Sequence, residues 1–139
     1  MVRFSNFDLI RILMKNSRTP YTIIAKKFGV TETAIRKRIR KLEDNGIIVS
    51  YTIDVNTKKL GFSVGLIGVD TKPEFYTNVI EELKSNPKIK KLYTSTGDHM
   101  LMFEFWFKNN KELRNFTKKI KNIQGVTKVC PAILLERIK

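Results

Sequence analysis

The sequence predicts an α+β protein of two domains, with a helical domain first and a βαββαβ domain after it. Two observations predict this order. Apolar residues recur with the period of a helix as far as Gly46, and runs rich in β-branched and aromatic residues begin after it. At 139 residues the chain is long enough for one ordinary domain or for two small ones, and two small ones would be helped by dimerisation.

The first helix is predicted over residues 6–17, where Asn6 or Asp8 is available as the N-cap. Four apolar residues share one face at helical spacing: Phe7, Ile10, Leu13 and Met14.

The second helix is predicted over residues 19–29, with Thr19 as the N-cap, Pro20 at the first helical position and Gly29 as the stop. Its inward residues are Ile24, Ala25 and Phe28.

The third helix is predicted over residues 30–46, with Thr31 as its N-cap and Gly46 at its end. Only the letters GVT separate it from the second helix, which is the tight connection of a helix-turn-helix. A narrow apolar stripe must pack on the two preceding helices: Ile35, Ile39 and Leu42.

A strand-like segment follows at residues 47–55, with Tyr51 and Ile53 on one side. We predict a domain boundary after it, giving a winged-helix-like domain over residues 1–62 and a second domain over 63–139. The first domain carries 13 Lys and Arg against 5 Asp and Glu, so it has the higher charge density. A DNA-binding domain would require this.

The second half reads strand, helix, strand, strand, helix, strand, which predicts a ferredoxin-like domain with both helices on one face of an antiparallel sheet. The strands are expected at 63–71, 88–96, 99–107 and 126–138, and the helices at 73–85 and 110–122. The residues expected to face inward from the helices are Tyr76, Val79, Ile80, Leu83, Leu113, Phe116 and Ile120.

The third of these strands is apolar on both of its faces, because Met100, Met102 and Trp106 alternate with leucine and phenylalanine. A sheet with one wet face would show polar residues at every second place. An exposed apolar face is a partner site, and a second copy of the chain is the commonest partner. The three residues therefore predict a dimer face, with membrane binding as the rival interpretation.

Charge and composition restrict the function. Lys and Arg number 27 against 13 Asp and Glu, which gives a net charge of +14 and favours nucleic acid as the partner over membranes. No apolar run is long enough to span a bilayer, and no signal peptide is visible, so we expect a cytoplasmic protein. One cysteine and one histidine predict no disulfide and no metal site, and no motif predicts a cofactor or a catalytic residue.

The third helix carries five positive charges and no acid between residues 36 and 41. A merely solvated helix face would mix charges of both signs at a spacing of four residues. Arg36 and Arg40 can present a planar fork to guanine, and the other polar residues suit phosphate. The predicted DNA-binding residues are Thr31, Thr33, Arg36, Lys37, Arg38, Arg40 and Lys41.

Over nearly its whole length the chain resembles the Lrp/AsnC (leucine-responsive, feast/famine) family of transcription regulators. The specific run is RIRKLEDNGII with GVT upstream, and TSTGD before an apolar strand is a weaker match. The resemblance implies a regulator that binds promoter DNA as a dimer, pairs through the sheet of its second domain and often assembles further. It also implies an effector, in many cases an amino acid, held near a loop that here contains Ser95, Thr96, Gly97 and Asp98.

One position departs from the family pattern, since Met100 stands where an acidic residue is usual. A carboxylate there would bind the ammonium of an amino acid strongly, so its loss puts the usual effector in doubt. Two alternatives remain open. Sirohaem decarboxylases share this architecture but would need polar, histidine-bearing walls, and an RNA-binding winged helix would need exposed aromatics.

Overall fold

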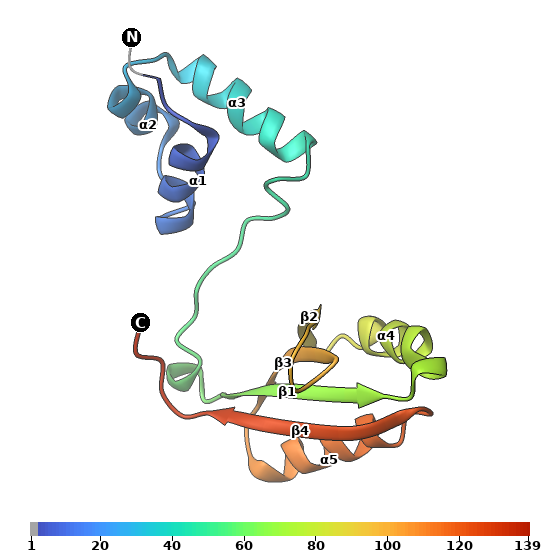
Figure 1. The fold of residues 1–139 in the computed structure, drawn as a ribbon. Helices are drawn as coiled ribbons and strands as arrows, with labels where there is room; N and C mark the ends of the chain where they lie inside the picture. Colours follow the sequence, from blue (N-terminus) through green and yellow to red (C-terminus); the bar gives the residue numbers. More distant parts are fainter. Residues whose placement is uncertain (1–2) are drawn as a thin grey trace. The chain divides into compact units, whose positions relative to one another are not determined.

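The computed structural model describes residues 3–139, which fall into two compact units that divide between Asp54 and Val55 (Figure 1). The boundary predicted from the sequence lies eight residues later, after Phe62. The intervening residues contain a 3₁₀ turn, Lys58–Leu60, that the fold groups with the second unit.

The first unit consists of three helices: α1 (Asn6–Lys15), α2 (Tyr21–Phe28) and α3 (Glu32–Asp44). Their buried side chains form one apolar core, made of Leu9, Leu13, Ile24, Ala25, Phe28, Ile35, Ile39 and Leu42. The predicted inward residues of α2 and α3 all belong to this core, so both predictions are confirmed. Thr31 also caps α3 as predicted, since its hydroxyl accepts a hydrogen bond from the Ala34 N–H at 3.1 Å.

The predicted inner face of the first helix is partly wrong. Leu9 and Leu13 are the buried residues, whereas Phe7 is 66% exposed and Met14 is 79% exposed. The predicted cap is wrong as well, because Ser5 caps α1 and accepts from the Asp8 N–H at 3.1 Å. The Asp8 carboxylate in turn accepts from the Ser5 N–H at 2.8 Å, which completes a capping box and lowers the pKa of Asp8.

The start of α2 also differs from its prediction. Pro20 is the N-cap, and Thr19 lies before it. Gly29 ends the helix in the left-handed conformation, at φ 66°, as its predicted role as a stop requires.

The strand expected over residues 47–55 does not form. The segment is extended chain, and its apolar side chains are exposed, with Val49 at 87% and Ile53 at 78%. A strand needs a neighbour to satisfy its backbone, and no other described segment of the chain pairs with this one. Propensity alone therefore produced a wrong prediction here.

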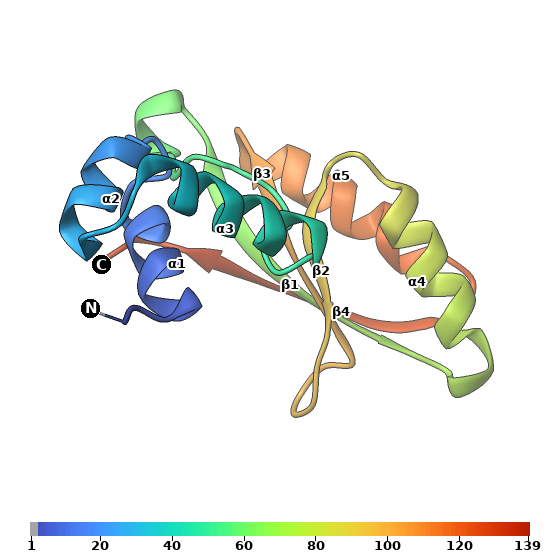
Figure 2. The same ribbon diagram turned by 90° about the horizontal axis from the view of Figure 1, so that it is seen from above.

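The second unit is a four-stranded antiparallel sheet with two helices (Figure 2). Its elements are β1 (Ser63–Thr71), α4 (Tyr76–Ser85), β2 (Ile89–Thr94), β3 (Leu101–Phe107), α5 (Asn110–Lys121) and β4 (Val126–Leu134), with a 3₁₀ turn, Pro73–Phe75, before α4. The strand order β2-β3-β1-β4 and the antiparallel pairing confirm the predicted ferredoxin-like arrangement.

Both helices pack on the same face of this sheet. The buried core there comprises Ile67, Val69, Val79, Leu83, Leu101, Phe103, Phe105, Phe107, Leu113, Phe116 and Ile120. Phe105 and Phe116 stack with ring centroids 3.8 Å apart, which fixes α5 on β3. Pro131 lies in β4, where the lost N–H is tolerated because β4 is an edge strand.

Candidate functional site

The polar side of α3 is strongly basic. Around its buried stripe, six of the seven predicted DNA-binding residues are exposed: Thr31, Thr33, Arg36, Lys37, Arg40 and Lys41. Arg38 is half-buried and so differs from the others. In this fold, α3 therefore already exposes most of the predicted DNA-binding residues to solvent.

Arg36 is exposed but contacts two other residues of its own chain. Its Nη2 lies 2.7 Å from Glu32 Oε1, one turn earlier on α3, and its guanidinium lies 5.7 Å from the Tyr21 ring centroid. Glu32 lies outside the run of cations at residues 36–41 that predicted a DNA-binding helix, although its spacing of four residues from Arg36 is visible in the sequence. Both side chains are about half exposed, so the pair is weak, and the Arg36 fork can leave Glu32 at little cost.

Lys37 and Arg40 lie on the part of α3 opposite its buried stripe. Within residues 3–139, no ion pair involves either side chain. These two cations are therefore unneutralised in the free protein, which is the state that a polyanion would complement.

Arg38 is held on two sides. Its Nε donates to Asn6 Oδ1 of α1 at 2.9 Å, and its guanidinium lies 4.2 Å from the centroid of the Phe4 ring. Phe4 itself stacks on the buried Phe28 at 4.1 Å. These contacts join residues far apart in the chain, so no local sequence signal could have predicted them.

The predicted effector residues form the loop between β2 and β3. Ser95 closes the loop, since its N–H donates to the Met100 carbonyl at 2.9 Å and its hydroxyl donates to the His99 carbonyl at 2.7 Å. Gly97 turns the chain at φ 102°. All four residues, Ser95 to Asp98, are exposed.

Next to this loop, Asp70 of β1 is bonded to the Met100 N–H and to the His99 ring, two contacts that were not predicted from the sequence. Asp70 Oδ1 accepts from the Met100 N–H, and Oδ2 lies 3.0 Å from His99 Nδ1. Because an ionised carboxylate only accepts, Nδ1 carries the hydrogen of this bond. Burial opposes ionisation of Asp70, but the bonds from His99 and the Met100 N–H outweigh burial and lower the pKa of Asp70.

The sheet face away from the helices carries two of the three predicted dimer residues. Met102 and Trp106 lie there on β3, opposite Gly68 and Val64 of β1. Met100 does not join them, because it packs against the helix-side core and its sulfur accepts from the Thr71 N–H at 3.5 Å. Glu104 also lies on this face and accepts from Trp106 Nε1 at 2.7 Å. The strand register places Lys90, Asp70 and Lys128 on the same face, so the face mixes apolar and charged side chains rather than being wholly apolar.

Comparison with known proteins agrees with this geometry. Residues 5–49 match a family model described as winged helix-turn-helix DNA-binding, and residues 65–139 match one described as the Lrp/AsnC ligand binding domain. The chain belongs to the Lrp/AsnC family of transcription regulators. The prediction of a DNA-binding regulator is thereby confirmed, and nothing in the comparisons favours the sirohaem-decarboxylase alternative.

Relatives and solved structures of the Lrp/AsnC family resemble the whole chain. The transcriptional regulator LrpA of Pyrococcus horikoshii is 51% identical over 133 residues, which cover 94% of each chain. LrpA1 of Halobacterium salinarum is 35% identical over the same share of each chain. The structure of Escherichia coli AsnC is 30% identical, with a TM-score of 0.81 over 99% of this chain and 95% of that one.

No helix within residues 3–139 is long and apolar enough to cross a membrane. No three of the described His, Cys, Asp or Glu side chains gather in a way that could hold a metal ion.

Proposed function

We propose that this Lrp/AsnC regulator reads double-stranded promoter DNA with α3, as a homodimer or a larger oligomer. The observation that carries the proposal is the exposed basic side of α3, where Lys37 and Arg40 lie opposite the buried stripe and form no ion pair within residues 3–139. In helix-turn-helix proteins the second helix of the motif enters the major groove and meets base edges there. Arg36 and Arg40 are the candidates for guanine, and Thr31, Thr33, Lys37, Arg38 and Lys41 for phosphate.

Dimerisation would occur through the open sheet face. Met102 and Trp106 lie beside Val64 and Leu66 of β1, and Leu134 of the edge strand is 52% exposed. An apolar sheet face of this kind supports pairing with a second copy by two-fold symmetry. Two paired chains would carry two copies of α3, which suits a pseudo-palindromic site with half-sites about 34 Å apart.

The second domain is also proposed to bind a small-molecule effector. Support comes from its match to the Lrp/AsnC ligand binding domain and from the exposed loop Ser95–Asp98. An amino acid is the first candidate class, although Met100 supplies no carboxylate for its ammonium. An effector would act by favouring one oligomer over another.

Selection of bound sequences from a random pool of double-stranded DNA tests this function. We expect a pseudo-palindromic consensus, and affinity for it should fall steeply with salt, since each neutralised phosphate contributes about −0.9 to the log-log slope. The absence of any consensus together with a flat salt dependence would contradict the proposal. A thermal-shift panel of amino acids tests the effector, because a ligand at 100 times its Kd stabilises by about 2.7 kcal/mol.

A further inference from the structure

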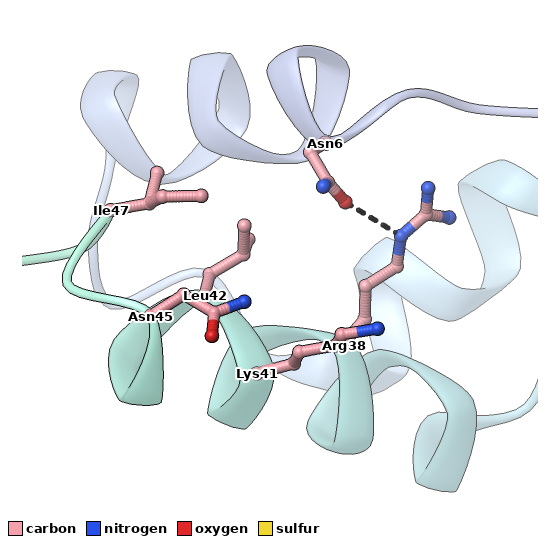
Figure 3. Close-up of a pocket in the computed structure, with 6 residues that line it drawn as sticks. All are labelled: Asn6, Arg38, Lys41, Leu42, Asn45 and Ile47. Atoms are coloured by element: carbon pink, nitrogen blue, oxygen red, sulfur yellow. Dashed lines mark hydrogen bonds between the residues drawn. The ribbon is translucent and has the colours of Figure 1, made fainter.

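A pocket lies between the start of α1 and the last turns of α3 (Figure 3). Its volume is about 210 Å³. The lining residues are Asn6, Arg38, Lys41, Leu42, Asn45 and Ile47. Two of them are cations, two are amides, two are apolar and none is an acid.

Arg38 lines one side of this pocket and is held by two contacts. Figure 3 shows Asn6 reaching from α1 to the Arg38 Nε, to which it is bonded at 2.9 Å. On its flat side the guanidinium lies against Phe4, which rests on the buried Phe28. A bond to Nε and a ring on the flat face leave the two terminal amino groups of Arg38 to donate elsewhere.

Within the part of the chain that the structure describes, no carboxylate forms an ion pair with Arg38. Arg36, two residues earlier, has Glu32 at 2.7 Å, whereas no ion pair among residues 3–139 includes Arg38 or Lys41. Holding a half-buried arginine with a neutral amide rather than an acid keeps its full positive charge available. The Asn6 and Asn45 amides add neutral donors beside the two cations, so the pocket is suited to an anion with several acceptor oxygens.

We propose that this pocket binds a phosphate group, supplied by the backbone of bound DNA, and that Asn6 and Phe4 are positioning residues that aim Arg38 at it. The inference rests on the proposed function, because α3 is the element placed against DNA. A phosphate anchored here fixes the position of α3 along the duplex without reading its sequence. Arg38 would thus contribute to affinity, and Arg36 and Arg40 to base preference.

The variant Asn6→Asp tests the proposal. Aspartate is nearly isosteric, holds Arg38 Nε at least as well and is favoured in the first turn of a helix, so folding should not weaken. The new carboxylate would, however, neutralise Arg38 and repel a phosphate. We expect DNA affinity to fall equally on preferred and random sequences, with a log-log salt slope smaller by about 0.9 and an unchanged thermal midpoint or a raised one.

The matched control is Asn16→Asp at the other end of α1, where the side chain accepts a hydrogen bond from the Arg18 N–H. This variant makes the same change in net charge outside the pocket. If the two variants have the same affinity and salt slope, no DNA phosphate occupies the pocket. A purely structural role for Asn6 predicts a different result, because the Asn6→Asp variant would then bind DNA as well as the wild type does.

A second arm identifies the source of the phosphate. Thermal midpoints are measured in inorganic phosphate and in chloride at equal ionic strength. A rise in phosphate that Asn6→Asp abolishes, with a DNA slope equal to that of the control, would assign the pocket to a free phosphate and overturn the DNA source. No difference between variants in either arm would overturn the pocket altogether. Wild-type protein that shows no salt-dependent DNA binding would instead contradict the proposed function, and the phosphate arm would still test the pocket.

Discussion

At the scale of single residues, Arg36 is the most direct test of sequence reading. Replacing it with alanine should weaken binding to the preferred operator by about 1 to 3 kcal/mol and should weaken binding to unrelated DNA less, because a guanidinium fork discriminates guanine from other bases. Fluorescence anisotropy on a set of operators with single base changes measures the effect. A uniform loss over all sequences would make Arg36 a phosphate contact.

Two further variants separate the contact of Arg36 with guanine from the general attraction of positive charge to DNA. Lys37→Ala should weaken binding to all sequences alike and reduce the salt slope by about 0.9.

Glu32→Gln removes the acid that forms an ion pair with Arg36, so it should strengthen DNA binding and preserve the base preference. Its effect on stability should be less than about 1 kcal/mol.

Asp70 gives a prediction about pH. Asp70→Ala should lower the free energy of unfolding at pH 7 by about 1 to 3 kcal/mol, because the Met100 N–H and His99 lose their charged acceptor. The pKa of Asp70 is lowered below its ordinary value of 3.8, so its contribution is complete above that value and is lost as the pH falls through the folded-state pKa. Urea unfolding should therefore show a larger difference between the variant and the wild type at pH 7 than at pH 3.

The exposed Asp98 is the matched control for Asp70. Asp98→Ala removes the same charge from the neighbouring loop between β2 and β3, and it should leave stability unchanged at both pH values, since its side chain is exposed. An equal loss at pH 7 and pH 3 for Asp70→Ala would mean that packing, and not the carboxylate charge, stabilises this corner of the sheet.

At the scale of elements, β1 leaves room for the imidazole of His99 by having glycine at position 68. A Cβ built on Gly68 would lie 2.3 Å from His99 Cδ2, so an alanine there must displace the imidazole and break its bond to Asp70. We expect Gly68→Ala to cost about 1 to 3 kcal/mol of unfolding free energy. In a His99→Ala background the same substitution should cost less, because the obstruction is gone; additive losses in this double-mutant cycle would contradict the contact.

Elements defined by local chemistry could be predicted from the sequence, and those that depend on distant partners could not. The stripe of Ile35, Ile39 and Leu42 and the cap at Thr31 are local, and both predictions were correct. The strand over residues 47–55 was predicted from local propensity but needs a partner that the described chain does not supply. The buried face of α1 was predicted wrongly because the exposed Phe7 and Met14 continue the apolar pattern on either side of the two buried leucines.

The same distinction applies to the candidate site. The run of cations on α3 was visible in the sequence, and six of the seven predicted residues are exposed as a DNA-reading face requires. The pose of Arg38 was not visible, because it depends on Asn6, which lies 32 residues earlier in the chain. The bond between Asp70 and His99 spans 29 residues and was missed for the same reason.

At the scale of the whole molecule, the proposed pairing of two chains through the open sheet face can be tested with a single added charge. Stable interfaces bury about 1,200 to 2,000 Å² in total, and an unpaired charge buried in them is costly. Met102 lies on that face on β3, opposite Gly68. Met102→Lys should therefore disfavour the dimer, while in a separate chain the new ammonium stays in water, so the fold should survive.

Sedimentation at micromolar concentration measures this outcome. We expect the wild type to have at least twice the chain mass of 16.2 kDa and Met102→Lys to approach the single-chain mass. The control is Leu60→Lys, which adds the same charge at a residue that is 59% exposed and lies outside the sheet. A wild-type monomer, or a dimer that tolerates Met102→Lys, would contradict pairing through this face. If pairing occurs there, Met102→Lys should also weaken operator binding without altering contacts at α3, because two recognition helices held at a fixed spacing bind a palindromic site more tightly than one.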